Sequence, residues 1–98
     1  MSTIRVKQTH SFDRDEARNR FASFEEMMGK YGAKLDWNGY TAAIKGIGVS
    51  GDVHVLTDAV EIVLKLGMMA KAAGVDPVRL EGSITRRLEA AFTDPQTS

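Results

Sequence analysis

Residues 60–88 change their hydrophobic period from two to a helical period within a short distance, and this change constrains the fold more than any other feature. Apolar residues first occupy alternate positions from Val60 to Leu66, which is typical of a half-buried strand. Apolar residues then recur at helical spacing, at Leu80, Ile84, Leu88 and Phe92. A strand followed by an amphipathic C-terminal helix predicts a small α+β domain.

The N-terminal third predicts a strand followed by one helix. Thr3–Thr9 alternates apolar with charged residues, as in a short strand. Ser11 or Asp13 can accept hydrogen bonds from the free N–H groups at the start of the helix. The apolar face of this helix is spaced by threes and fours, at Ala17, Phe21, Phe24, Met28 and Tyr31. Gly32 is expected to end it, because glycine readily adopts the left-handed conformation.

Asn38-Gly39 joins two strand-like runs, Ala33–Trp37 and Tyr40–Lys45. This dipeptide is typical of a two-residue hairpin loop, since both residues tolerate the positive φ of a type I′ turn. On one face of the sheet, the turn would pair Trp37 with Tyr40, Leu35 with Ala42 and Ala33 with Ile44.

Two further turns complete a four-strand meander. A turn near residues 46–48 leads into a strand at Val49–Leu56, and residues 57–59 turn into the strand that ends at Leu66. Met68–Ala73 predicts a separate turn of helix ended by Gly74. The last helix should begin at Asp76-Pro77, because aspartate caps helices and proline suits the first helical position.

The resulting order, β-α-β-β-β-β-α, predicts an α+β fold with a single antiparallel sheet and two helices packed on one face. We expect the meander strands in sequence order and the first strand beside the fifth, which gives a helix-grip-like outline. The predicted domain spans residues 1–93, and residues 94–98 form a frayed polar tail.

The composition narrows the classes of function. Thirteen basic and thirteen acidic residues balance, so no overall field attracts nucleic acid. The chain contains no cysteine, which excludes disulfides and thiolate metal sites. No apolar run is long enough to span a membrane, and no signal peptide is evident, so we expect a soluble cytoplasmic protein. We expect neither a metal nor a cofactor.

Two sequence patterns resemble a cofactor-binding motif and a catalytic pair, but neither has the surrounding features that such a site needs. Residues 46–51 match G-x-G-x-x-G, but a β-type run follows where a dinucleotide site needs a helix. We interpret this segment as a glycine-rich hairpin turn with a bulge. Asp52 and His54 share one face of a strand, yet they lack a nucleophile and further metal ligands. An enzyme built on this pair is a minor alternative, and we assign no catalytic residue.

The candidate binding residues are apolar groups that could line a gap between sheet and helices, and basic groups near the C-terminus. Methionine suits surfaces that adapt to apolar partners, and arginine suits acidic or phosphate groups. An ordinary core and a solvated helix face are the competing interpretations. The candidates are Trp37, Tyr40, Met68, Met69, Lys71, Arg79, Arg86 and Arg87.

Several segments together resemble one small protein family. They are the E-A-R-N-R-F helix, L-D-W-N-G-Y, I-K-G-I-G-V-S-G-D-V-H-V, V-E-I-V-L-K-L-G and the final R-L-E-G-S-I-T-R-R-L helix. From about Ile4 to Leu88 the chain resembles the putative polyhydroxyalkanoic acid system proteins, which are associated with genes for polyester storage. The A-K-A-A-G-V-D-P connection is longer than the resemblance leads us to expect.

The resemblance implies a non-enzymatic accessory protein of the polyhydroxyalkanoate storage system. Such a protein would bind the polyester granule surface or a granule-associated protein, and it would lie in the cytoplasm at storage granules. The alternative is a small soluble carrier for a hydroxyacyl or other fatty-chain ligand. Exposed sheet edges also make a homodimer an expectation.

Overall fold

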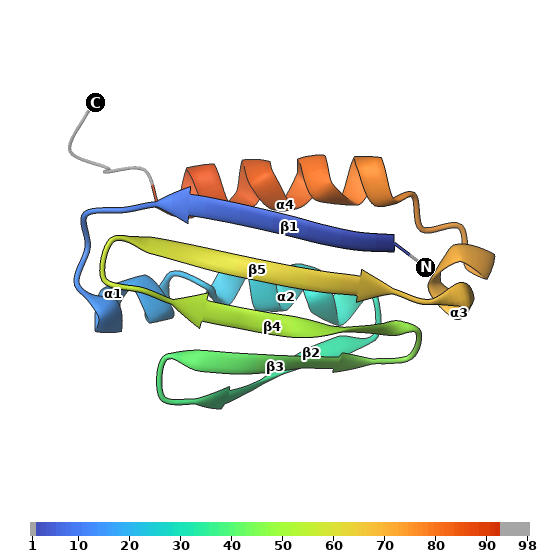
Figure 1. Cartoon of the computed structure of the whole chain (residues 1–98), viewed down its shortest axis with the longest axis horizontal. Coiled ribbons are helices and arrows are strands. Elements are labelled where there is room, and N and C mark those ends of the chain that lie inside the picture. Colours follow the sequence, from blue (N-terminus) through green and yellow to red (C-terminus); the bar gives the residue numbers. More distant parts are fainter. Residues whose placement is uncertain (1, 93–98) are drawn as a thin grey trace.

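The protein is built on one five-stranded antiparallel sheet (Figure 1). The computed structural model describes residues 2–92, except for the side chain of Lys71. The strand order is β1-β5-β4-β3-β2, which confirms the predicted topology. The strands are β1 (Ser2–Thr9), β2 (Ala33–Asn38), β3 (Thr41–Gly46), β4 (Val49–Val55) and β5 (Ala59–Leu66). Residues 94–98, the predicted tail, lie outside the described residues.

The two longer helices cover one face of the sheet and leave the other face open (Figure 1). One of them, α4, packs on β1, and the other, α2, packs on β2. The short helix α3 follows β5 at one end of the sheet, as predicted. The helices are α1 (Arg14–Asn19), α2 (Ala22–Lys30), α3 (Met68–Ala72) and α4 (Pro77–Phe92).

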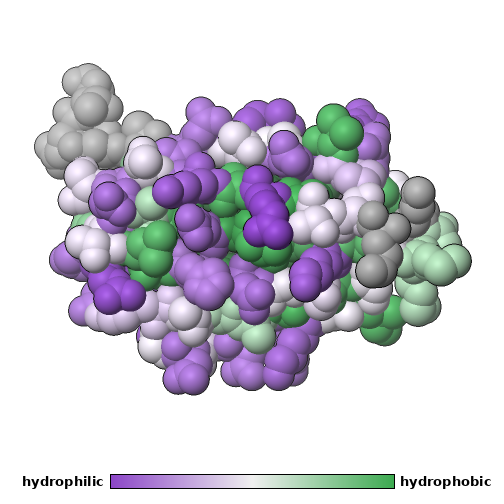
Figure 2. All heavy atoms as spheres, viewed as in Figure 1, coloured by the Kyte–Doolittle hydropathy of each residue, from purple (hydrophilic) through white to green (hydrophobic). Residues whose placement is uncertain are grey.

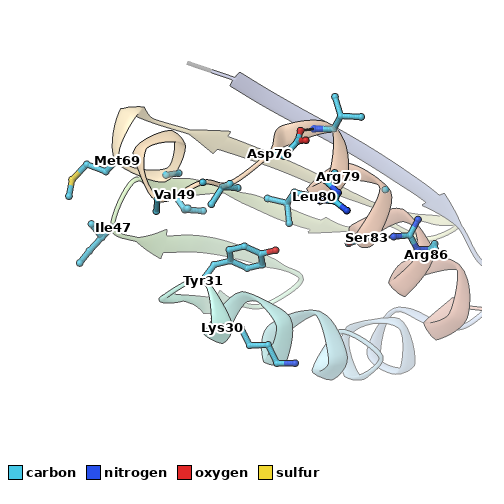
Figure 3. Close-up of a pocket in the computed structure, with 16 residues that line it drawn as sticks. Lys30, Tyr31, Ile47, Val49, Met69, Asp76, Arg79, Leu80, Ser83 and Arg86 are labelled. Carbon is cyan, nitrogen blue, oxygen red and sulfur yellow. Dashed lines mark hydrogen bonds between the residues drawn. The ribbon is translucent and has the colours of Figure 1, made fainter.

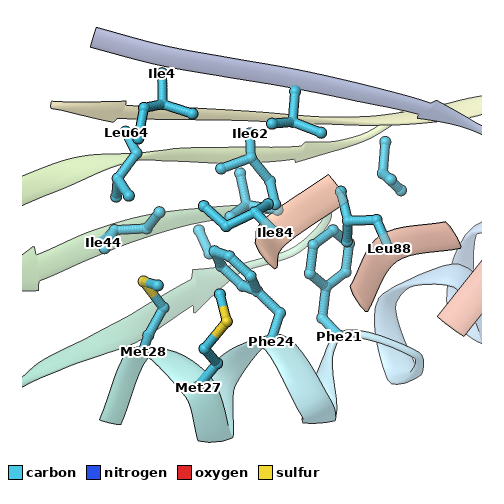
Figure 4. Close-up of a cluster of buried hydrophobic side chains, with 14 of the residues drawn as sticks. Ile4, Phe21, Phe24, Met27, Met28, Ile44, Ile62, Leu64, Ile84 and Leu88 are labelled. Atoms are coloured by element: carbon cyan, nitrogen blue, oxygen red, sulfur yellow. The ribbon is translucent and has the colours of Figure 1, made fainter. Parts of the chain in front are cut away.

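The core lies between the covered face of the sheet and the two longer helices (Figure 4). Alternate residues of each strand point toward the helices, so the period-two pattern is converted into one apolar layer. Each large side chain that is fully buried contributes roughly 1.5–3 kcal/mol. The largest of them include Ile4, Phe21, Phe24, Met28, Ile44, Ile62, Leu64, Ile84 and Leu88.

The predicted single N-terminal helix is in fact two helices. The Asp13 carboxylate caps α1 by accepting from the Glu16 N–H at 2.8 Å, but the chain leaves the helix at Arg20 and Phe21. This break places Phe21 in the core, where it is fully buried. Tyr31 was expected on the buried face, yet it follows the end of α2 and is 39% exposed.

The predicted turn at Asn38-Gly39 is displaced by one residue. Asn38 belongs to β2 and pairs with Thr41, so the loop residues are Gly39 and Tyr40. Of these two loop residues, only Gly39 has a positive φ, 66°. A positive φ at the first loop residue alone is typical of a type II′ turn. The register therefore pairs Trp37 with Ala42 and not with Tyr40, which lies in the loop, while the side chains within the two strands keep their predicted faces.

The second hairpin contains no bulge, in contrast to the prediction. Gly46 pairs with Val49 across a two-residue loop of Ile47 and Gly48. Gly48 has a φ of 75°, and an added Cβ would lie 2.8 Å from the backbone nitrogen of Ala70. Its carbonyl oxygen accepts from the Gly67 N–H at 2.8 Å. This hairpin therefore fixes the position of α3, where the candidate site lies.

Candidate functional site

A surface groove lies between the C-terminal end of α2 and the first half of α4 (Figure 3). Its volume is 1020 Å³, and the β3–β4 hairpin and α3 form its end wall. The residues that line it include Lys30, Tyr31, Ile47, Val49, Met69, Asp76, Val78, Arg79, Leu80, Gly82, Ser83 and Arg86.

The floor of the groove is apolar. Val49 from β4 and Leu80 from α4 are buried core residues that also line the groove. In Figure 3 the Tyr31 ring lies between α2 and α4, with its flat face beside this floor. Because the Asp76 carboxylate caps α4 by accepting from the Val78 N–H at 3.0 Å, the first turn of α4 is fixed at the wall of the groove.

The sides of the groove are basic. Lys30 lies on the α2 side, where Figure 3 shows its side chain directed away from the floor, and Arg79 and Arg86 lie on the α4 side. Across residues 2–92, the ion pairs lie elsewhere, at Lys7–Glu61, Arg20–Glu16 and Lys45–Asp36. Asp76 is the only acidic residue among the lining residues of the described chain, and it already caps α4. The groove thus has an unbalanced positive charge.

Exposed apolar side chains gather around the end of this groove. Ile47, Met68, Met69 and Val78 are between 63% and 82% exposed, and we call them the apolar end patch. Among the described residues, the remaining exposed large hydrophobic side chains are Tyr31, which lines the groove, and Leu56 in the β4–β5 loop. Figure 2 shows hydrophobic surface at this α3 end, beside a largely hydrophilic open sheet face.

The structure brings together only part of the predicted binding set. Met69, Arg79 and Arg86 line the groove, and Met68 is adjacent in the apolar end patch. Arg87 faces a different, shallow hollow, where its Nη1 donates to the Ser23 carbonyl at 3.5 Å. The side chain of Lys71 lies outside the described part of the chain.

Trp37 and Tyr40 do not share a gap with the two methionines. They lie where β2 turns into β3, at the end of the sheet opposite to α3 (Figure 1). The Arg18 guanidinium lies 4.8 Å from the centre of the Trp37 ring, and that of Arg14 lies 4.1 Å from the centre of the Tyr40 ring. The Tyr40 hydroxyl donates to the Asp15 carboxylate at 2.8 Å, and this hydrogen bond raises the pKa of Tyr40.

Asp52 and His54 lie on the open face of the sheet, as the strand pattern predicted. They border a shallow hollow of 360 Å³ together with Asp36 and Thr41. Within residues 2–92, no three histidine, aspartate or glutamate side chains are arranged to hold a metal ion.

Sequence reasoning missed Lys30, Tyr31, Ile47 and Val78. Ile47 offered a signal, because a large apolar residue in a two-residue turn has no core to enter. Val78 offered another, since it lies two residues before Leu80 and therefore on the opposite side of α4 from the core. Lys30 and Tyr31 gave no signal, because only the packing of α2 beside α4 brings them to the groove.

Comparison with protein families places the chain in a known family. The family model described as "Putative polyhydroxyalkanoic acid system protein" matches residues 4–92. A search of curated proteins and a search of solved structures each found no match. None of the helices in the described chain combines the length and apolarity needed to cross a membrane.

Proposed function

Because the chain belongs to the family of putative polyhydroxyalkanoic acid system proteins, we propose that it is a non-enzymatic accessory protein that binds the polyester surface of storage granules. The apolar end patch is the contact surface. The observation that carries this proposal is the gathering of four highly exposed apolar side chains at one end of the molecule. Apolar patches of this kind mark sites that meet apolar partners.

The chemistry of the patch matches a polyester. A polyhydroxyalkanoate surface presents aliphatic carbons and ester carbonyl oxygens. Met68 and Met69 can adapt to an irregular aliphatic surface, because their side chains are unbranched and flexible. Lys30 and Arg79, at the nearby groove, carry donors that suit carbonyl oxygens. Each apolar side chain that becomes fully covered would contribute roughly 1.5–3 kcal/mol, which supports reversible adsorption.

Granule sedimentation with the Met68→Glu/Met69→Glu double variant tests this proposal. Purified protein is mixed with washed granules, and the fraction that sediments is measured. Both side chains are highly exposed, so the fold should persist while the charges oppose contact with the polymer. We expect the bound fraction to fall severalfold. Undiminished binding by the folded double variant would remove the proposal.

Ile47→Glu and Leu56→Glu provide a matched pair of single variants. Both change an exposed apolar loop residue to glutamate, but only Ile47 belongs to the apolar end patch. Ile47→Glu should weaken sedimentation, and Leu56→Glu should not. Treating the granules with protease beforehand separates two partners: retained binding supports the polyester itself, and lost binding supports a granule protein instead.

The proposal assigns no catalytic role to Asp52 and His54. Their side chains occupy the open sheet face, away from the groove and the patch. We expect His54→Ala to leave the polymer content of producing cells unchanged. A clear fall in polymer content with a stably folded His54→Ala protein would favour the enzymatic alternative.

A further inference from the structure

We propose that the groove between α2 and α4 is a binding site for a free aliphatic monocarboxylate. The chain of the ligand lies along the apolar floor, and its carboxylate meets the basic side chains. This inference goes beyond granule docking, because it concerns a small soluble ligand and does not require the polymer surface.

The floor suits an aliphatic chain. Val49 and Leu80 form the base, and Tyr31 supplies a partly exposed ring between the two helices (Figure 3). Because Val49 and Leu80 are only 5% and 3% exposed, the apolar area that an aliphatic chain can cover belongs mainly to the other lining residues, Tyr31, Ile47, Met69 and Val78. The volume of 1020 Å³ is ample for a short or medium chain.

The charges suit an anionic head group. Three cations, Lys30, Arg79 and Arg86, line the groove, while the Asp76 carboxylate already caps α4. Lys30 and Arg79 belong to none of the ion pairs of the described chain, so they remain available to an anion. A guanidinium can hold a carboxylate by two parallel hydrogen bonds. Arg86 and Ser83 lie close together, with 3.5 Å between Nη2 and Oγ, and add donors on the same wall.

Gly82 leaves room on the α4 wall of the groove. A glycine within a helix lowers helix stability, so alanine would be the better residue for α4 alone. A Cβ at this position would meet only the flexible end of Arg86, at 3.4 Å. A large side chain at position 82 can therefore fill the groove without entering the core.

Titration of the purified protein with octanoate, followed by protein NMR, tests the site directly. Octanoate should shift the resonances of Tyr31, Gly82 and Ser83 and saturate with a single site. 1-Octanol, which lacks the charge, should bind about tenfold more weakly, and acetate, which lacks the chain, should not bind. Absence of saturable octanoate binding, or equal binding of 1-octanol, would overturn the proposal.

Two matched pairs of variants locate the ligand. Arg79→Gln should weaken octanoate binding roughly two- to fivefold, as expected for one exposed charge pair. Arg87→Gln, on the same helix but outside the groove, should not. Gly82→Phe should abolish binding, while Gly82→Ala should retain it and raise the melting temperature. Full octanoate affinity in a folded Gly82→Phe protein would exclude the groove as the site.

The single variant Met68→Glu and the variant Gly82→Phe separate this inference from granule docking. Met68 does not line the groove, so Met68→Glu should bind octanoate normally even if it loses granules. Gly82→Phe should sediment with granules normally even if it loses octanoate. If the protein binds granules but not octanoate, only the groove proposal is wrong. If it binds octanoate but not granules, only the granule proposal is wrong.

Discussion

At the scale of single residues, Trp37 and Tyr40, both partly buried, show why aromatic side chains are ambiguous in a sequence. Both were binding candidates, yet Arg18 and Arg14 from α1 lie over their rings. Trp37 also meets Phe21 edge-to-face, with 5.8 Å between ring centres. These contacts hold α1 against the β2–β3 hairpin, so we assign the two residues to the fold and the apolar end patch to binding.

Tyr40→Phe should change how stability depends on alkaline pH. The hydrogen bond to Asp15 raises the pKa of Tyr40 above its ordinary value of 10.0, because the phenol donates only when protonated. A raised folded-state pKa gives stability that is fully present below the ordinary pKa and is lost as the pH rises through the folded-state pKa.

Urea unfolding of the native protein and Tyr40→Phe at a series of pH values measures this effect. The native protein should be the more stable at about pH 8, and the difference should shrink above about pH 10. A difference that is constant across this range would mean that the Tyr40–Asp15 hydrogen bond contributes nothing to stability.

At the scale of secondary-structure elements, the break between α1 and α2 is the feature on which the packing of the N-terminal half depends. Phe21 lies at this break and contacts three aromatic rings edge-to-face: those of Phe24, Trp37 and Phe92. These partners come from α2, β2 and α4. One buried side chain thus joins α2 and β2, which follow it in the sequence, to α4 at the other end of the described chain.

Phe21→Ala should destabilise the protein by about 3–5 kcal/mol, as large-to-small substitutions of buried aromatics do. Urea unfolding measures the loss. Val78→Ala, at an exposed position of α4, is the control and should change stability by less than about 0.5 kcal/mol. A cost below about 1 kcal/mol for Phe21→Ala would mean that the aromatic contacts do not join these elements.

Gly48→Ala should displace α3 as well as strain the hairpin. Both Gly48 and Gly74 have positive φ, so alanine at either position should cost roughly 1–2 kcal/mol. Only at Gly48 does the new Cβ also meet α3, whereas nothing lies within 4 Å at Gly74. Gly48→Ala should therefore be the more damaging, and hydrogen exchange should increase in α3. Equal losses from the two variants would contradict this contact.

The elements were largely predictable because each follows from local patterns. The period-two strands and the capped α4 required no knowledge of distant contacts. The break between α1 and α2 could not be predicted from the sequence, because Phe21 and Phe24 keep helical spacing across it. The position of the hairpin loop was predicted wrongly, because Asn-Gly is typical of a two-residue loop, whereas Asn38 pairs with Thr41 and Gly39 begins the loop.

The groove was only partly predictable. Arg79, Ser83 and Arg86 are spaced by four and three, so they share one face of α4, and the sequence alone contains that pattern. Arg87 follows immediately but lies about 100° further around the helix, which explains its separate position. Lys30 and Tyr31 enter the groove only through the packing of α2 beside α4.

At the scale of the whole molecule, the surface is divided by chemistry. The open sheet face carries charges of both signs, including the Lys7–Glu61 and Lys45–Asp36 pairs. The apolar end patch and the basic groove occupy the α3 end. Docking through that end would leave the open sheet face and the edge strands β1 and β2 in contact with water. The expected homodimer, through these edges, remains a prediction.

This division predicts the orientation of the protein on granules. Lys30 lines the groove beside the apolar end patch, whereas Lys7 lies on the open sheet face in the half of β1 distant from α3. Lysine acetylation of granule-bound and free protein, read by mass spectrometry, should show Lys30 protected on granules and Lys7 equally reactive in both states. Because free Lys30 and Lys7 are both exposed, protection must come from the granule. The reverse pattern would mean that the sheet face, and not the α3 end, contacts the polymer. Equal protection of both lysines would mean that the protein binds without a fixed orientation.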